Sequence, residues 1–180
     1  KSGFRGSAGE MFPDGAKIHN DLPAMMSIGA EYKITPKFSA AAGLHYYWDK
    51  GVSYGKTLNG VQVDNDEIID NNYLELSLGL EYGISEKLFA SAGYLRAITG
   101  VSKDYQSDIS FSLTSNTFGG GLGYKITDKI MVNLGVAYSM YIDETKDYEH
   151  RFSGTTNDIP LSETYFKNNL IMGIGLDISF

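Results

Sequence analysis

One sequence unit recurs three times in this chain and constrains its fold more than any other feature. Each copy is an apolar run with a tyrosine, an Ile-Ser/Thr-x-Lys turn, and a second run that ends in glycine. The copies span residues 28–43, 78–93 and 120–135 and align without a gap. Their spacing, about 50 and then about 42 residues, is typical of a repeated supersecondary unit. The unit predicted here is a β-hairpin.

Alternation of apolar with small or polar residues, at a period of two, predicts seven strands in a single domain over residues 1–180. In the segment 38–48, for example, Phe38, Leu44 and Trp48 share one face, and Ser39 and Gly43 share the other. Residues 1–22 are expected to be a loop or a partial strand. The expected strands are residues 24–33, 38–48, 74–82, 88–94, 118–124, 130–140 and 170–180.

The connections alternate between short turns and long polar segments. Residues 50–72 and 143–163 are predicted to be polar loops, whereas the strands around 101–113 are expected to continue as a two-stranded ribbon. Outer-membrane barrels have short periplasmic turns and longer outer loops. A ten-residue strand tilted by about 40° crosses about 25 Å, which is the height of their apolar band.

Composition narrows the function classes. The net charge of −7 and pI of about 4.9 argue against a nucleic-acid partner, which requires a basic face. The mean hydropathy of −0.20 looks soluble, and no apolar run is long enough for a transmembrane helix. Transmembrane β-strands, however, alternate lipid-facing and lumen-facing residues, so their mean hydropathy is modest.

Aromatic residues occur at matching places in the predicted strands, as the girdles of a membrane barrel require. A soluble β-sandwich also alternates, but it gives no reason for tyrosines to gather at the turn ends. The fold class predicted is therefore all-β, a transmembrane antiparallel up-and-down β-barrel in the bacterial outer membrane, in contact with outer-membrane lipids. The predicted periplasmic girdle is Tyr32, Tyr82 and Tyr124, and the outer girdle is Tyr46, Trp48, Tyr94 and Tyr138.

The segments 21–32 (Asp-Leu-Pro-Ala onward) and 173–180, with the three hairpin turns, resemble the hydrocarbon and long-chain fatty-acid transporters of the FadL/TodX type. The C-terminal Phe180 resembles the signal read by the barrel assembly machinery. The resemblance implies a fourteen-strand barrel with an N-terminal hatch, of which this chain corresponds to the C-terminal half. The N-terminal half of the same barrel is then an expected partner, and a hydrophobic small molecule is the expected substrate.

Catalytic and metal-binding motifs are absent from the sequence, so neither an enzyme nor a cofactor is predicted. The histidines lack ligand spacing, and His150 near Asp143, Asp147 and Ser153 is interpreted as part of a solvated loop. Acidic residues between 64 and 70 could offer oxygen ligands to calcium, but the run lacks the glycine of a calcium loop. A solvated acidic loop is the preferred interpretation there.

Two functions remain open from the sequence. One is passive uptake of hydrophobic small molecules such as long-chain fatty acids or aromatic hydrocarbons; the other is a structural or interaction barrel, such as an adhesin, an anchor or a secretion-system subunit. Many inward positions are glycine, which either admits a polypeptide segment into the lumen or eases strand curvature. Arg96 falls on the apolar face, so either a bulge turns it away or it snorkels. Substrate contacts are predicted at His45, Tyr47, Tyr73 and Leu95.

Overall fold

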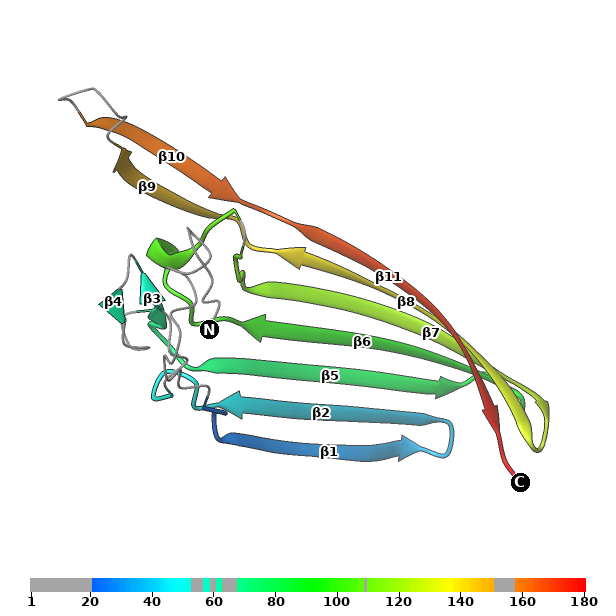
Figure 1. The fold of residues 1–180 in the computed structure, drawn as a ribbon. Coiled ribbons are helices and arrows are strands. Elements are labelled where there is room, and N and C mark those ends of the chain that lie inside the picture. The colour runs from blue at the N-terminus through cyan, green and yellow to red at the C-terminus, as the bar shows by residue number, and fades with distance from the viewer. Residues whose placement is uncertain (1–20, 53–56, 59–60, 63–67, 109, 151–157) are drawn as a thin grey trace, which may run out of the picture.

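A seven-stranded antiparallel sheet forms the body of the protein in the computed structural model, which describes residues 21–52, 57–58, 61–62, 68–108, 110–150 and 158–180. The sheet is a meander in the order β1-β2-β5-β6-β7-β8-β11 (Figure 1). Its strands are β1 (Met25–Thr35), β2 (Phe38–Tyr47), β5 (Tyr73–Gly83), β6 (Leu88–Ile98), β7 (Ser115–Thr127), β8 (Ile130–Tyr141) and β11 (Asn168–Ile178).

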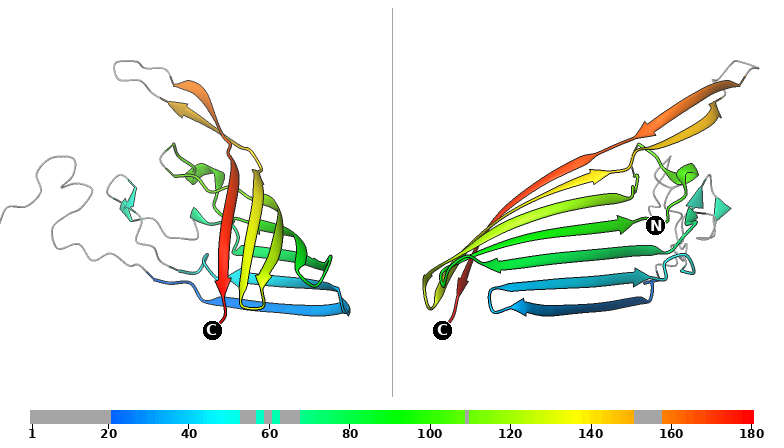
Figure 2. Two further views of the ribbon diagram at one scale, coloured as in Figure 1. Left: turned by 90° about the vertical axis from the view of Figure 1, so that its right-hand side faces the viewer. Right: turned by 180° about the vertical axis from the view of Figure 1, so that it is seen from behind.

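The short turns lie at one end of the sheet and the long connections at the other, as the sequence predicted (Figure 2). We call the end with the long connections the loop end. Two short two-stranded sheets lie there: β3 (Thr57–Leu58) with β4 (Val61–Gln62), and β9 (Glu144–His150) with β10 (Ile159–Tyr165). Within the described residues, β1 and β11 each pair on one side only, so the sheet is open.

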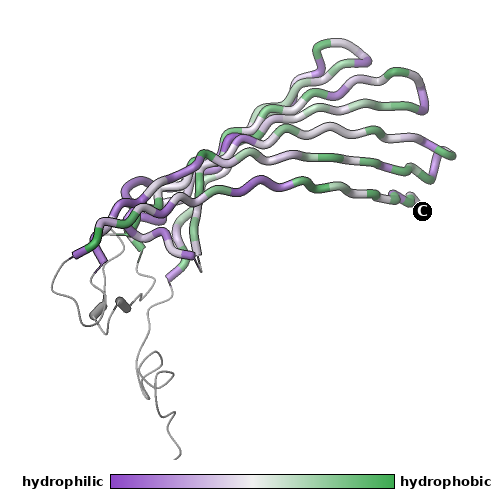
Figure 3. The backbone as a smooth tube through the Cα atoms, turned by 90° about the horizontal axis from the view of Figure 1, so that it is seen from above, coloured by the Kyte–Doolittle hydropathy of each residue, from purple (hydrophilic) through white to green (hydrophobic). Residues whose placement is uncertain are grey.

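The alternation predicted from sequence appears as two distinct faces of the sheet, with hydrophobic and hydrophilic residues interleaved along each strand (Figure 3). The outward face carries large apolar side chains that stay exposed: Leu78 is 59% accessible and Ile174 is 79%. No second sheet of comparable size packs on this face in the described part of the chain, which contradicts the sandwich alternative. An apolar surface of this extent needs a non-aqueous environment.

The tilt of the strands can be calculated from the register positions of three tyrosines. The register aligns Tyr32 with Leu80 of β5 through Ala40, so Tyr82 lies two residues nearer the turn end. Tyr124 is displaced by the same amount relative to Tyr82. With about 3.3 Å per residue and 4.8 Å between strands, a level girdle corresponds to a tilt of about 35°. Outer-membrane strands tilt by about 35–45°, so these tyrosines can share one membrane level.

Two predictions for the long connections were wrong. The predicted polar loop 143–163 contains the ribbon β9–β10, which continues β8 and β11 beyond the sheet (Figure 1). The predicted ribbon over 101–113 is replaced by a short 3-10 helix, η1 (Lys103–Tyr105), and irregular backbone. The reason is local pairing: Gln106 exchanges two hydrogen bonds with the backbone of Ser112, at 2.8 Å each, and folds the segment onto itself.

The buried apolar residues of the described chain lie at the loop end, outside the seven-stranded sheet. Ile68, Ile69, Leu113 and Tyr165 are the buried apolar residues, and Gln106 is only 2% exposed. The connections after β2 and β6 meet at the Ile69–Val101 bridge, and Tyr165 at the end of β10 contacts Phe111 of the second connection. No helix in the described ranges is long and apolar enough to cross a membrane.

Candidate functional site

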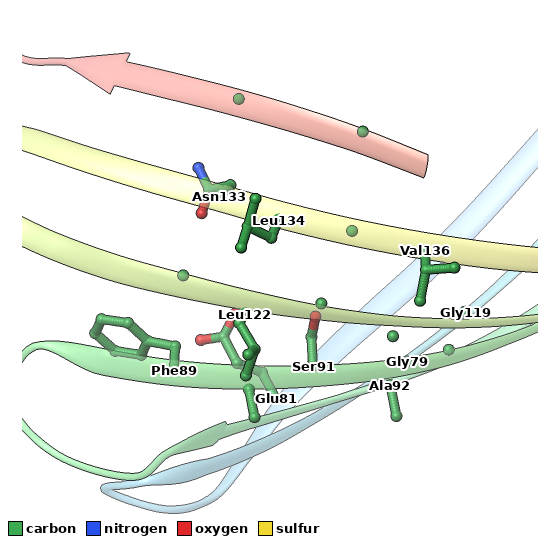
Figure 4. Close-up of a pocket in the computed structure, with 18 of the residues that line it drawn as sticks. Gly79, Glu81, Phe89, Ser91, Ala92, Gly119, Leu122, Asn133, Leu134 and Val136 are labelled. Carbon is green, nitrogen blue, oxygen red and sulfur yellow. The ribbon is translucent and has the colours of Figure 1, made fainter. Parts of the chain in front are cut away.

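The inward face of the sheet holds a groove of about 1000 Å³. Alternation brings residues of one kind to its floor, because inward positions of adjacent strands are mostly glycine, alanine or serine. Ser91 and Ala92, consecutive on β6, point to opposite sides of the sheet, and only Ser91 belongs to the inward face (Figure 4). The small inward residues along the groove are Ser39, Ala41, Gly79, Ser91, Gly93, Gly119, Gly121, Gly123, Gly135, Ala137, Gly173 and Gly175.

Some of these glycines are also required by close packing across the sheet. A β-carbon on Gly121 would lie 2.9 Å from the Ser91 hydroxyl and 3.1 Å from the Leu134 carbonyl oxygen. By contrast, Gly79 has its nearest neighbour at 3.9 Å, and Gly173 has none within 4 Å. At these two positions glycine is not needed for strand packing, and its effect is to keep the groove open.

Larger polar and aromatic groups lie at the turn end of the groove, and no role was predicted for them from the sequence. The Lys125 ammonium lies 4.9 Å from the centre of the Phe89 ring, and the Asn133 amide donates to Asp177 at 2.7 Å. Glu31 and Glu81 add carboxylates to the lining. The period-two alternation was enough to predict that these residues face inward. It gave no indication of what they do there.

Three of the four predicted substrate contacts meet on the inward face near the loop end. The rings of Tyr47 and Tyr73 lie edge to face, with centroids 5.4 Å apart. The Tyr73 hydroxyl donates to Glu75 at 2.7 Å, and Ser27 and His45 share a hydrogen bond of 3.0 Å. The backbone N–H of Tyr73 donates to Asp49 at 2.9 Å, which anchors the start of β5.

Leu95, the fourth predicted contact, faces inward between Ser77 and Thr117, nearer the turn end than Tyr73. Neither Leu95 nor the tyrosine pair lines the groove, whose lining lies nearer the turn end. The inward face therefore has two levels: an aromatic and polar level near the loops, and a level with little side-chain volume below it.

The predicted girdle residues lie on the outward face. Tyr46 and Trp48 pack edge to face at 4.9 Å, and the Tyr46 hydroxyl accepts a bond of 2.8 Å from Asn72. Tyr94 contacts Phe118 at 5.1 Å between ring centroids. Arg96 also faces outward, because the β5–β6 and β6–β7 registers run through it without a shift. The predicted alternative of a bulge at Arg96 was wrong.

The described residues contain no group of three or more His, Cys, Asp or Glu that could hold a metal ion. Asp70, the described member of the acidic run 64–70, is exposed, and Asp64, Asp66 and Glu67 lie outside the described residues. Ser153, named with His150 above, is likewise outside them.

The family model for the outer membrane protein beta-barrel domain matches residues 3–176. No curated protein matches the chain.

Proposed function

Because the chain belongs to the outer membrane protein β-barrel domain family and therefore lies in the bacterial outer membrane, we propose that it forms a passive conduit for hydrophobic small molecules. Long-chain fatty acids and aromatic hydrocarbons are the substrate classes that we propose. The resemblance to the FadL/TodX type motivates this choice, and the inward face supports it independently.

The groove on the inward face is the observation that carries this proposal. Its lining is mostly apolar or glycine, and no large side chain rises from its floor at Gly79 or Gly173. Ligand sites for apolar molecules are concave, mostly apolar and supplied with few polar groups. The Tyr47–Tyr73 pair near the loop end offers flat apolar surface with hydroxyl groups, where a substrate arriving from outside would first make contact.

Uptake by variants that fill the groove tests the proposal. Gly79→Phe puts an aromatic ring into the groove, and we expect slower uptake of a fluorescent long-chain fatty acid by vesicles that contain the full-length protein. Gly120→Phe is the matched control, because Gly120 is outward and its β-carbon would meet only the Ser91 carbonyl oxygen at 3.6 Å. Equal uptake by the two variants would count against the groove as the route.

Substitution of the Tyr47–Tyr73 pair gives a second test of the proposal. Tyr47→Ala combined with Tyr73→Ala is expected to weaken substrate binding without closing the groove, so that uptake falls most at low substrate concentration. Tyr138→Ala removes a tyrosine from the outward face and serves as the control. If the double variant and the control behave alike, the substrate does not use the tyrosine pair.

A structural or interaction barrel is the second candidate, and the ribbon β9–β10 favours it. The ribbon extends past the sheet and is braced by side-chain hydrogen bonds, including Thr145 to Thr164 at 3.0 Å and Tyr148 to Glu163 at 2.5 Å. An ordered projection of this kind can present a surface to a macromolecule. Deletion of residues 146–162 separates the candidates: uptake should persist if the barrel is a conduit, whereas an adhesin or subunit would lose partner binding.

A further inference from the structure

Arg96 is the only charged residue on the outward face of the seven described sheet strands. It pairs in register with Leu76 of β5 and Asn116 of β7, and both of these residues are outward. A cation that faces hydrocarbon is costly, and such residues generally mark function and have a partner. The chain carries a net charge of −7, so an isolated arginine on this face does not follow from a basic composition.

The side-chain amides of the outward face align with Arg96 in the register. Asn116 and Asn168 are the only side-chain amides on the outward face of these strands, and both align with Met140 in the register. Along the row the residues are Leu76, Arg96, Asn116, Met140 and Asn168. The outward face is otherwise apolar and aromatic, with a threonine at two turns and small residues between, so its one charge lies directly beside one of its two amides, Asn116.

The height of Arg96 on the outward face matches the level of lipid headgroups. At a tilt of about 35°, the position of Arg96 along β6 is about 19 Å from the Tyr82 level, toward the loop end. Tyr46 and Tyr138 lie at the same height by the same construction. Tyrosines of this kind mark the membrane interface, and the loop end of outer-membrane barrels faces the cell exterior. Arg96 therefore lies in the headgroup region of the outer leaflet.

Hydrogen bonds hold the guanidinium in place and leave donors for a ligand. The Asn116 carboxamide oxygen accepts a bond of 2.9 Å from the Arg96 guanidinium and one of 2.7 Å from the Tyr94 hydroxyl. A guanidinium has five N–H donors, and the described residues use one of those of Arg96. Because Asn116 accepts through its oxygen, its NH₂ group remains a donor beside the guanidinium.

We propose that Arg96 and Asn116 bind the phosphate of a phosphorylated outer-leaflet lipid. The planar fork of a guanidinium matches phosphate oxygens in a bidentate manner, and charge-assisted bonds of this type are strong. Tyr94 and Phe118, in contact at 5.1 Å, lie one row toward the membrane centre and provide an apolar surface for the acyl chains of the same lipid. This site is on the opposite face from the groove and is independent of the proposed transport.

Native mass spectrometry of the full-length protein in detergent tests this site. The probe is a bisphosphorylated lipid A, compared with the same lipid after removal of its phosphates and with inorganic phosphate. Of the three probes, the wild-type protein should retain only the phosphorylated lipid. Arg96→Leu should lower retention roughly tenfold, since it removes a charge-assisted hydrogen-bonding partner. Arg96→Lys keeps the positive charge but lacks the planar guanidinium, so its lipid retention should lie between those of the wild type and Arg96→Leu.

Lys33→Leu is the matched control, because it removes one positive charge from the inward face, where Lys33 pairs with Ser39. Its lipid retention should equal that of the wild type. Arg96→Leu makes the lipid-facing surface more apolar, so we expect the variant to fold. A heat-modifiable band on electrophoresis checks that it does. Equal retention by Arg96→Leu and wild type, retention of the dephosphorylated lipid, or displacement by inorganic phosphate at equal concentration would each overturn the proposal.

Discussion

Gly100 lies against the backbone of Asn71 so closely that a β-carbon on Gly100 would be 1.4 Å from the Asn71 carbonyl oxygen. The Gly100 carbonyl in turn accepts bonds from the N–H groups of Asp70 and Asn71, at 2.7 and 3.3 Å. The connections that follow β2 and β6 are therefore joined by a backbone contact that only glycine permits. Ile68 and Ile69 are buried beside this contact.

Gly100→Ala is expected to separate the two connections, because backbone atoms cannot yield as a flexible side chain does. Overpacking of this kind costs about 1–3 kcal/mol. Limited proteolysis of the folded barrel should then cut more quickly in the connection between β2 and β5 and in that between β6 and β7. Gly51→Ala is the control, since nothing lies within 4 Å of a β-carbon there. Protease resistance of Gly100→Ala equal to that of Gly51→Ala would show that the contact does not hold the loops.

The sheet, its strand order and its two faces were predictable from sequence because a period-two pattern allows few assignments of residues to the two faces. A shift by one residue would exchange the lipid-facing and inward sets of a strand, so Leu78 facing outward requires Ser77 facing inward. The tyrosines before the turns fixed the strand ends to within a few residues. The same alternation placed His45, Tyr47 and Tyr73 on one face, although it could not show which of them touch.

The connections at the loop end were not predictable by this route. Both faces of β9 are largely polar, so its hydropathy shows no period of two. On β10, Ile159, Leu161 and Tyr165 share one face, but that run is short and Glu163 interrupts it. The burial of Gln106 depends on its bond of 2.7 Å to Glu144, which is 38 residues away. A local polar sequence does not indicate a contact over that separation.

Leu78→Arg tests the assignment of the outward face. Leu78 is 59% exposed and lies near the middle of the apolar band, where a charged side chain costs about 2–4 kcal/mol. We expect that loss in a reversible folding titration in lipid bilayers. Ser77→Ala, on the adjacent inward position, should change the free energy of unfolding by less than about 1 kcal/mol. Similar losses for the two variants would refute the assignment.

The orientation of the barrel can be tested with single cysteines, since the chain contains none. Asp108 is an exposed residue of the loop end, and Glu86 lies in the turn between β5 and β6. A membrane-impermeant maleimide added to intact cells should label Asp108→Cys and leave Glu86→Cys unlabelled. Both should react after the outer membrane is permeabilised. Labelling of Glu86→Cys alone in intact cells would reverse the orientation, and with it the leaflet assigned to Arg96.

Glu163 on β10 accepts hydrogen bonds from two tyrosines, Tyr148 at 2.5 Å and Tyr165 at 2.6 Å. These bonds lower the pKa of Glu163 below 4.5 and raise that of Tyr148 above 10. The pKa of Tyr165 rises to about 12, chiefly because of the bond to Glu163 and then because of burial. The ribbon lies outside the seven-stranded sheet, where Tyr148 and Glu163 are partly exposed and Tyr165 is buried.

The pH dependence of the ribbon follows from the direction of each shift. The lowered pKa of Glu163 contributes stability above about pH 4.5 that is lost as the pH falls through the folded pKa. The raised pKa of Tyr165 contributes stability that is complete below pH 10 and is lost as the pH rises through about 12. Ultraviolet titration of wild type minus Tyr165→Phe should therefore show one tyrosine that ionises near 12. In a Glu163→Gln background the same difference should move toward 10, and an unchanged midpoint there would rule out the carboxylate as the cause.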